Sequence, residues 1–429
     1  MNDVLSQLRA GKLAGAKRLD LSCGLHELPR EVFDLADSLE VLNLSQNQLS
    51  SLPDDLGQLK KLRILFASDN QFTHLPAVLG ECPQLSMIGF KANQIEAVDP
   101  AAFPALLRWL ILTDNRIAAL PASLGRCDRL QKLMLSGNRL SHLPETMTNC
   151  SRLEMIRLAS NAFQALPDWL LQLPRLSWLA FAGNPCSPWR EVSPARPAIS
   201  WSGLEVQQQL GEGASGLIYG ARMLSSNRQV AVKVFKGAVT SDGLPASEIA
   251  ASLAAGQHPN LIEVHARLDG HPSGAEGLVM ELIDPEFSNL AGPPSLDTCT
   301  RDVYADGLRL SVNQALSVAL GVASAARHLH EHGLMHGDLY AHNVLWRTNG
   351  QCLLGDLGAA WFYDRPNALL ERVEVRAWGC LLEELVALSE DVPSALHALV
   401  ARCLDEVVGS RPTFRDICEE LEGMKRSHH

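Results

Sequence analysis

The sequence predicts two domains, an α/β solenoid of short repeats followed by an α+β domain. Three observations lead to this prediction. An asparagine recurs at steps of 22 or 23 residues through the first 190 residues of the 429-residue chain. A proline-rich stretch, residues 187–197, ends that period. The residues after it have no such period and alternate between strand-like and helix-like stretches.

The composition is that of a globular protein with well-packed cores, since 46% of residues are apolar and 20% are charged. The net charge of −11 argues against a nucleic-acid partner or a basic membrane anchor. No stretch reaches the ~18 consecutive apolar residues of a membrane-spanning helix, and the start of the chain lacks the pattern of a secretory signal. The ten cysteines include no Cys-x-x-Cys pair, so we expect a reduced, soluble, cytoplasmic protein.

The repeat has the form Leu-x-x-Leu-x-Leu-x-x-Asn, as in residues 39–47. The leucines on either side of one variable position point to the same side of a short strand, and the asparagine amide can bond backbone groups where the strand ends. Gly24 takes the asparagine's place in an earlier copy, which makes about eight units. The pattern resembles the leucine-rich repeat family over roughly residues 15–190. Its seven asparagines are Asn47, Asn70, Asn93, Asn115, Asn138, Asn161 and Asn184.

Apolar side chains occupy the strand positions that should face the concave surface, with Phe66, Trp109 and Trp178 the most prominent. Because exposed strand faces are usually polar, this stripe indicates a covered surface. The sequence leaves two coverings open: a separate protein substrate or partner, or docking in cis on the rest of this chain. Three cysteines at equivalent repeat positions, Cys82, Cys127 and Cys150, are expected to be small buried fillers.

The second domain begins with a glycine-rich segment, residues 211–216, between two strand-like runs. Glycines let backbone amides approach phosphate closely, and the second strand favours a hairpin over a dinucleotide-binding turn. Lys233 follows on an alternating strand, and Glu248 opens a helical stretch fifteen residues later. These two side chains can pair and hold the ammonium against nucleotide phosphates. Residues 277–283 read as a buried strand whose backbone could bond an adenine edge.

A group of polar residues in the second domain fits phosphoryl transfer. Asp338 can accept a hydroxyl proton, and Asn343 on the same loop can bind a metal ion. Asp356, thirteen residues after Asn343, follows a short apolar strand. One base and two Mg²⁺ ligands in this order are what that chemistry needs.

Taken in order, these motifs resemble the protein kinase superfamily over roughly residues 200–425. The whole chain resembles bacterial leucine-rich-repeat protein kinases of the serine/threonine type. The resemblance implies repeats over 1–190, a linker over 191–203 and a two-lobed α+β kinase domain over 204–425. It also implies Mg²⁺-dependent transfer of the γ-phosphate of ATP to protein Ser or Thr hydroxyls. The implied catalytic residues are Asp338, Lys233 and Glu248, the metal ligands are Asn343 and Asp356, and the nucleotide pocket comprises Leu210, Gly211, Gly213, Gly216, Ile218, Ala231, Lys233 and Glu281.

Several positions depart from the family pattern. Gly337 stands where the family has an Arg, and Tyr340 stands where serine/threonine kinases have a Lys. Glu374 stands where the family has an Asp that braces the catalytic loop, here residues 336–343. Arg411 matches an Arg that in the family normally pairs with a glutamate, and the corresponding glutamate here is Glu371. These departures leave open a nucleotide-binding scaffold without turnover, an aminoglycoside-type small-molecule phosphotransferase, and the choice between Ser/Thr and Tyr substrates.

The activation segment, residues 358–371, contains no Ser or Thr, and Tyr363 is its sole hydroxyl. Phosphate on this segment would also need a cation to order it, and the position before Asp338 is a glycine. The sequence therefore predicts an enzyme that Ser or Thr phosphorylation of this segment does not switch on. Glu281 enters the segment that the resemblance implies to be the hinge, and an insert that contains residues 299–304 follows it; the sequence of this insert suggests no role.

Overall fold

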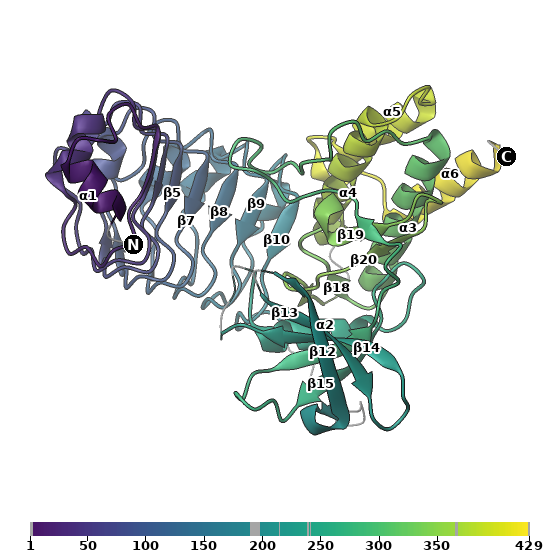
Figure 1. The fold of residues 1–429 in the computed structure, drawn as a ribbon. Helices are drawn as coiled ribbons and strands as arrows, with labels where there is room; N and C mark the ends of the chain where they lie inside the picture. The colour runs from purple at the N-terminus through teal and green to yellow at the C-terminus, as the bar shows by residue number, and fades with distance from the viewer. Residues whose placement is uncertain are drawn as a thin grey trace. The chain divides into compact units, whose positions relative to one another are not determined.

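The computed structural model describes residues 3–188, 198–213, 215–237, 240, 242–364 and 368–427. The chain forms two compact units (Figure 1). The first unit comprises Met1–Leu173 and Asn184–Cys186, and the second comprises Pro174–Gly183 and Ser187–His429. The strand of the last repeat is therefore part of the second unit.

The first unit is built on a parallel sheet of three-residue strands, one from each repeat (Figure 1). Neighbouring strands pair at the same repeat position, so that Leu42 lies opposite Leu65 and Leu65 opposite Ile88. Helix α1 (Asp3–Arg9) precedes the sheet. Its strands are β1 (Arg18–Asp20), β2 (Val41–Asn43), β3 (Ile64–Phe66), β5 (Met87–Gly89), β7 (Trp109–Ile111), β8 (Lys132–Met134) and β9 (Met155–Arg157).

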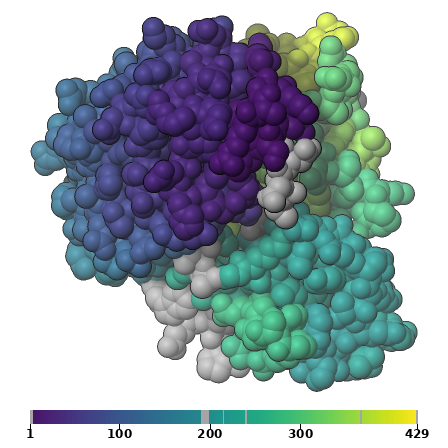
Figure 2. Space-filling view, turned by 60° about the vertical axis from the view of Figure 1, so that its left-hand side comes forward, coloured from purple at the N-terminus to yellow at the C-terminus, as the bar shows by residue number. Residues whose placement is uncertain are grey.

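Short 3-10 helices lead from one repeat to the next, and two further strands pair in parallel beside them. The repeat leucines are buried, and the early repeats pack into a continuous surface, purple in Figure 2. The helices are η1 (Arg30–Leu35), η2 (Leu56–Gln58), η3 (Ala77–Glu81), η4 (Ala122–Arg126), η5 (Glu145–Asn149) and η6 (Leu170–Gln172), and the two strands are β4 (His74–Leu75) and β6 (Ala97–Val98).

The asparagine ladder forms as the sequence predicts. The Asn115 amide donates to the carbonyls of Phe90 and Leu112 at 2.9 and 3.0 Å, and its oxygen accepts from the Ile95 N–H at 3.0 Å. Asn115 thus satisfies backbone groups of its own repeat and of the one before it. The residue before each asparagine is left-handed, with φ of +53° at Ala92, for example, which the repeat pattern did not predict. This conformation is unfavourable for L-residues and is held here by the ladder.

The repeat cysteines are buried fillers, as expected. Cys82, Cys127 and Cys150 are buried and free, and burial raises the pKa of Cys82 to about 12. Burial thus keeps this thiol in its neutral, unreactive form at neutral pH.

The second unit contains a mixed six-stranded sheet, whose first strand in chain order starts at Ala198. Residues 191–197 of the predicted linker lie outside the described residues. The rest of the predicted linker joins this sheet, because β11 (Ala198–Ser200) pairs with β15 (Val264–Asp269). The 3-10 turn η7 (Trp201–Gly203) follows β11. Helix α2 (Pro245–Ala255) contacts the sheet. The strand order is β11 (Ala198–Ser200), β15 (Val264–Asp269), β16 (Gly277–Glu281), β14 (Gln229–Phe235), β13 (Gly216–Met223) and β12 (Leu204–Glu212).

The rest of the second unit is mostly helical. Its longest helices, α3 (Val312–Glu331) and α4 (Ala368–Ala387), pack against each other, and Ser311 and Gln314 form a capping box at the start of α3. No helix among the described residues is both long enough and apolar enough to cross a membrane. The other elements are β10 (Trp178–Ala180), β17 (Ser288–Asn289), β18 (Leu334–Met335), η8 (Ala341–Asn343), β19 (Val344–Trp346), β20 (Cys352–Leu354), β21 (Trp361–Phe362), α5 (Ser394–Cys403), η9 (Val408–Ser410) and α6 (Phe414–Ser427).

Candidate active site

The glycine-rich segment is a hairpin, as predicted, because β12 and β13 pair antiparallel and the Gly213 N–H donates to the Gly216 carbonyl at 2.9 Å. A Cβ added to Gly211 or Gly213 would meet no atom within 4 Å. A Cβ at Gly216 would lie 2.6 Å from the Val234 carbonyl oxygen. The first two glycines therefore leave open space beside the backbone, and the third allows β13 to pack closely against β14.

Three apolar residues predicted for the nucleotide pocket lie on β12, β13 and β14. Leu210 is 46% exposed near the end of β12. Ile218 pairs with Lys233 between β13 and β14, and Ala231 pairs with Met280 of β16. The hairpin and the central strand therefore bring these side chains to one part of the sheet.

Lys233 and Glu248 form the predicted ion pair, with 2.5 Å between Nζ and Oε1. Both side chains are buried, and the Lys233 ammonium also lies 3.7 Å from Asp356 Oδ1. Burial disfavours the charge, but the Asp356 and Glu248 carboxylates outweigh it and raise the pKa of Lys233 above its ordinary value. The site therefore holds a fixed cation between two carboxylates.

Asp338 is held by its own loop. Asn343 Nδ2 donates to Asp338 Oδ2 at 3.0 Å and to the Asp338 carbonyl at 2.8 Å. The Asp338 N–H donates to His336 Nδ1 at 3.2 Å, and His336 Nε2 lies 2.9 Å from the Gly355 carbonyl oxygen. Because Nδ1 accepts, the proton of the neutral His336 ring is on Nε2 and is donated to Gly355. This ring joins the catalytic loop to the segment that carries Asp356.

The two predicted metal ligands come from adjacent strands. Asn343 directly precedes β19 and Asp356 follows β20, and Val344 pairs with Leu354 between these strands. Asp356 has a φ of +52°, accepts from the Gly358 N–H at 3.2 Å and is 51% exposed at its side chain. Asp356 offers an exposed carboxylate and Asn343 an amide oxygen, and Mg²⁺ prefers oxygen ligands.

Glu374 braces the catalytic loop as expected. Its Oε1 accepts from the Gly337 N–H at 2.7 Å, and its Oε2 lies 2.6 Å from His330 Nε2. Burial opposes ionisation of Glu374, but the bond and charge of His330 together with the Gly337 N–H hold its pKa below the usual range. Gly337 itself has a φ of +74°, and a Cβ there would lie 2.5 Å from the Ala359 carbonyl oxygen. The arginine of the family pattern does not fit this backbone.

The expected pair between Arg411 and Glu371 is wrong. Arg411 donates instead to the carbonyls of Asp405, Arg372 and Pro174 at 2.9, 3.1 and 2.8 Å. Glu371 accepts from the Tyr363 hydroxyl at 2.9 Å. Burial lowers the pKa of Arg411 to about 10, and backbone carbonyls satisfy its donors without a carboxylate.

The insert after the hinge supports the catalytic loop, which sequence reasoning missed. Asp302 Oδ2 accepts from the His342 N–H at 2.9 Å, and Asp302 Oδ1 lies 2.7 Å from His342 Nδ1. Tyr304 donates to Glu384 Oε2 at 2.9 Å and so fixes the insert to α4. The only signal was an acidic residue in a segment without periodicity, which does not reveal a partner forty residues away.

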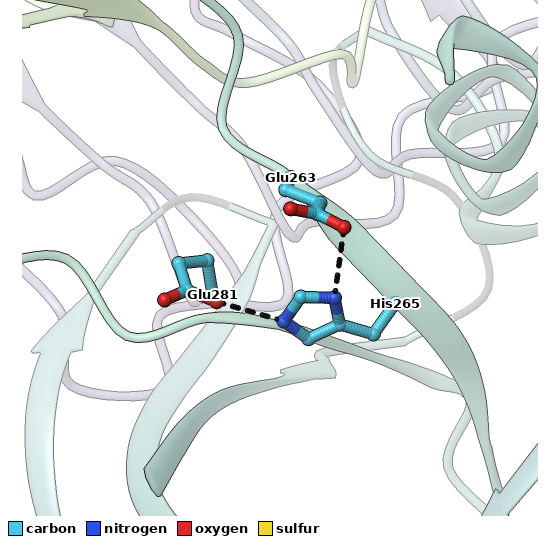
Figure 3. Close-up of side chains that lie close together, drawn as sticks. All are labelled: Glu263, His265 and Glu281. Carbon is cyan, nitrogen blue, oxygen red and sulfur yellow. Dashed lines mark hydrogen bonds and ion pairs between the residues drawn. The ribbon is translucent and has the colours of Figure 1, made fainter. Parts of the chain in front are cut away.

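Glu281 takes part in a polar cluster at the end of β16 (Figure 3). Its carboxylate lies 3.0 Å from His265 Nε2, and Glu263 lies 3.4 Å from His265 Nδ1. The group resembles a metal site, but Arg228 also donates to Glu281 at 2.5 Å and Gln257 to Glu263 at 2.6 Å. We therefore interpret it as an ion-pair network that ties β15 to β16, so a nucleotide contact of Glu281 would use its backbone.

Parts of this chain are similar to two known protein families. Residues 204–380 match the protein kinase domain family, and residues 15–72 and 128–185 match the leucine rich repeat family. The chain combines leucine-rich repeats with a protein kinase domain.

Similar proteins carry serine/threonine kinase names. The chain is 27% identical over 176 residues to serine/threonine-protein kinase ppk23 of Schizosaccharomyces pombe, covering 41% of each chain. It is 29% identical over 188 residues to serine/threonine-protein kinase PknF of Mycobacterium tuberculosis, covering 41% of this chain and 36% of that protein. It is 28% identical over 216 residues to a probable serine/threonine-protein kinase, At1g09600, of Arabidopsis thaliana, covering 44% and 28%. The matches span less than half the length of these relatives.

Proposed function

We propose that this protein is an ATP- and Mg²⁺-dependent kinase that phosphorylates Ser or Thr hydroxyls of proteins. The observation that carries the proposal is the continuous set of contacts from Glu248 through Lys233 to Asp356, together with Asp338 held by Asn343. The serine/threonine kinase names of the similar proteins support the choice of acceptor.

Each residue has a role that its surroundings support. Lys233 would bind the α- and β-phosphates of ATP, beneath the open backbone at Gly211 and Gly213. Asn343 and Asp356 would hold Mg²⁺, which neutralises charge on the phosphoryl oxygens. Asp338 would accept the proton of the substrate hydroxyl. Glu248 keeps the Lys233 ammonium in place.

We further propose that the repeats form a solenoid whose concave strand face binds a protein substrate or partner through Phe66 and Trp109. Both side chains are only half-buried. The Lys132 ammonium lies 4.1 Å from the Trp109 ring centre, and Trp109 Nε1 donates to Met134 Sδ at 3.4 Å. A fixed aromatic ring with an adaptable thioether beside it is typical of protein-binding surfaces.

One observation favours a second candidate, a nucleotide-binding scaffold without turnover. Tyr340 stands where serine/threonine kinases have a Lys, and it is buried. A buried phenol provides no positive charge for the transferred phosphoryl group.

The experiment uses the purified full chain with γ-labelled ATP and Mg²⁺. One reaction contains a Ser/Thr-rich protein acceptor, one contains an aminoglycoside and one contains no acceptor. Label in protein that disappears in Asp338→Asn supports the protein kinase. Label only in the aminoglycoside assigns a small-molecule phosphotransferase, and tight nucleotide binding without any transfer assigns the scaffold.

A further inference from the structure

The strand of the last repeat, β10, lies in the same compact unit as the catalytic loop. Its Trp178 is 1% exposed and stacks on Tyr340, with ring centres 4.1 Å apart and planes 6° apart. Trp178 Nε1 donates to the Leu339 carbonyl at 2.9 Å. These contacts hold the two residues that follow Asp338 in the chain.

The same strand also contacts the activation segment. The Leu179 carbonyl accepts from Trp361 Nε1 at 3.0 Å. The Phe181 and Trp361 rings meet edge to face, 5.6 Å apart. Successive residues of β10 therefore bind the catalytic loop and the activation segment, one as a donor and the next as an acceptor.

Two buried arginines anchor the segment that leads into β10. Arg376 of α4 donates to Ser177 Oγ at 3.0 Å, and Arg411 donates to the Pro174 carbonyl at 2.8 Å. Both guanidinium groups are buried, and the bonds to Ser177 and Pro174 satisfy one donor of each. Loss of these contacts would leave buried donors without partners, which favours the bound position of the segment.

Gly337 fits the same arrangement. A Cβ at this position would lie 2.8 Å from the Leu179 carbonyl oxygen as well as 2.5 Å from that of Ala359. Neither backbone oxygen can move away cheaply, so the strand of the last repeat fills the space that a larger side chain would need. Position 337 is a glycine where the family pattern has an Arg, and the backbone of β10 leaves no room there for a side chain.

We propose that β10 is a built-in part of the phosphotransfer site that positions the catalytic loop and the activation segment, with Trp178 as the positioning residue. The inference rests on the proposed kinase function. A displacement of about 1 Å at a catalytic group can reduce turnover by ~100-fold, and Leu339 adjoins Asp338. The strand thereby fixes the site without a phosphate on the activation segment.

The test compares three variants of the full chain at a temperature well below melting. Trp178→Ala removes both the stack and the hydrogen bond, and Trp178→Phe keeps a stacking ring but removes the donor. Trp169→Ala, a tryptophan substitution in the first unit before η6, is the matched control. The measurements are kcat with a protein acceptor, the Kd for Mg²⁺-ATP, and hydrogen exchange of residues 336–343 and 358–364.

Trp178→Ala is expected to lower kcat by about 10- to 100-fold, leave the Kd for Mg²⁺-ATP within threefold, and speed exchange in both segments. Trp178→Phe should fall between this variant and the wild type, and Trp169→Ala should match the wild type. Unchanged kcat and exchange in Trp178→Ala would overturn the inference. So would a rise in kcat, which would show that β10 blocks the site, or an equal loss of nucleotide binding in both Trp178 variants, which would show a general loss of structure.

The exchange measurement separates this inference from the proposed function. If the wild type transfers no phosphate to any acceptor, the kinase proposal fails by itself. Faster exchange of residues 336–343 in Trp178→Ala, with residues 229–235 of β14 unchanged, would still support positioning by β10. Equal exchange in both proteins would reject it.

Discussion

Lys233, with its buried ammonium group, is the residue on which the proposed chemistry depends most. Lys233→Met removes the cation that lies 2.5 Å from Glu248 and 3.7 Å from Asp356. We expect phosphoryl transfer to fall by at least about 100-fold, because phosphate positioning provides most of the catalysis in this reaction. The measurement is kcat/KM for ATP.

The same variant leaves Glu248 buried without its partner, which costs about 3–5 kcal/mol of the free energy of unfolding. Lys233→Met combined with Glu248→Gln removes that carboxylate charge and should recover most of the lost stability. It should not recover activity. Wild-type turnover in either variant would contradict the role of Lys233.

His342 makes the stability of the fold depend on pH. Burial disfavours the imidazolium, but the bond and charge of Asp302, with the charges of Asp338 and Asp356, raise the pKa of His342 above its usual range. A His whose pKa is raised on folding stabilises the fold fully below pH ~6.5, and this contribution is lost as pH rises through the raised pKa. Asp302→Asn should therefore cost about 1.5–3 kcal/mol at pH 6 and much less at pH 9.

Urea unfolding of the wild type and of Asp302→Asn at several pH values checks this prediction. The difference between the two proteins should shrink as pH rises. A difference that stays constant from pH 6 to pH 9 would show that the contact does not depend on the charge of His342.

At the scale of elements, the asparagine ladder holds neighbouring repeats together. Asn115→Ala removes the partners of the Phe90 and Leu112 carbonyls and of the Ile95 N–H. Because these groups are then buried without hydrogen bonds, the free energy of unfolding should fall by about 2–4 kcal/mol. Asn149→Ala, an exposed asparagine at the end of η5, is the control and should change it by less than ~0.5 kcal/mol. Denaturant unfolding of both variants tests the difference, and equal values would refute the ladder's role.

The activation segment is held by packing in its described part. Tyr363 is 2% exposed, and its hydroxyl donates to Glu371 at 2.9 Å and lies 3.4 Å from the His330 carbonyl oxygen. A kinase could phosphorylate this hydroxyl only after local unfolding. Tyr363→Phe should therefore keep activity within about threefold and cost ~1 kcal/mol of stability. Phosphatase treatment should change little, and an activity that follows a phosphate on Tyr363 would contradict this prediction.

Short-range patterns predicted much of these elements. The repeat period predicted the asparagine ladder. The alternation of apolar and polar residues around Lys233 and the helix that follows it predicted the pair of Lys233 with Glu248, because strand and helix geometry determine such contacts. The hydrogen bond of Asp302 to His342 and the carbonyl partners of Arg411 were not predictable. They join segments that no local period relates, and Arg411 bonds backbone groups that carry no sequence signature.

At the scale of the whole molecule, the least predictable feature is what the strand of the last repeat binds. Residues 174–183 continue the repeat pattern, and β10 forms there as that pattern predicts. Trp178 and Leu179 also hydrogen-bond groups more than 150 residues away in the chain, which no local period reveals. A sequence period predicts the local structure of a segment, whereas its distant partners depend on tertiary contacts.

The two tryptophans that the sequence placed on one stripe differ in their surroundings, since Trp178 is buried and Trp109 is half-buried. Trp178→Ser removes a buried ring from the second unit, so stability should fall by about 3 kcal/mol or more and Tm by about 6–12 °C, with no partner present. Trp109→Ser changes a half-buried ring of the first unit. If this ring anchors a protein substrate, its loss should raise the KM for that substrate by about 30-fold, equivalent to ~2 kcal/mol, and shift Tm by less than ~2 °C. Calorimetry and steady-state kinetics on both variants distinguish the two roles. Equal effects of the two substitutions on Tm and on KM would show that the stripe acts as one surface.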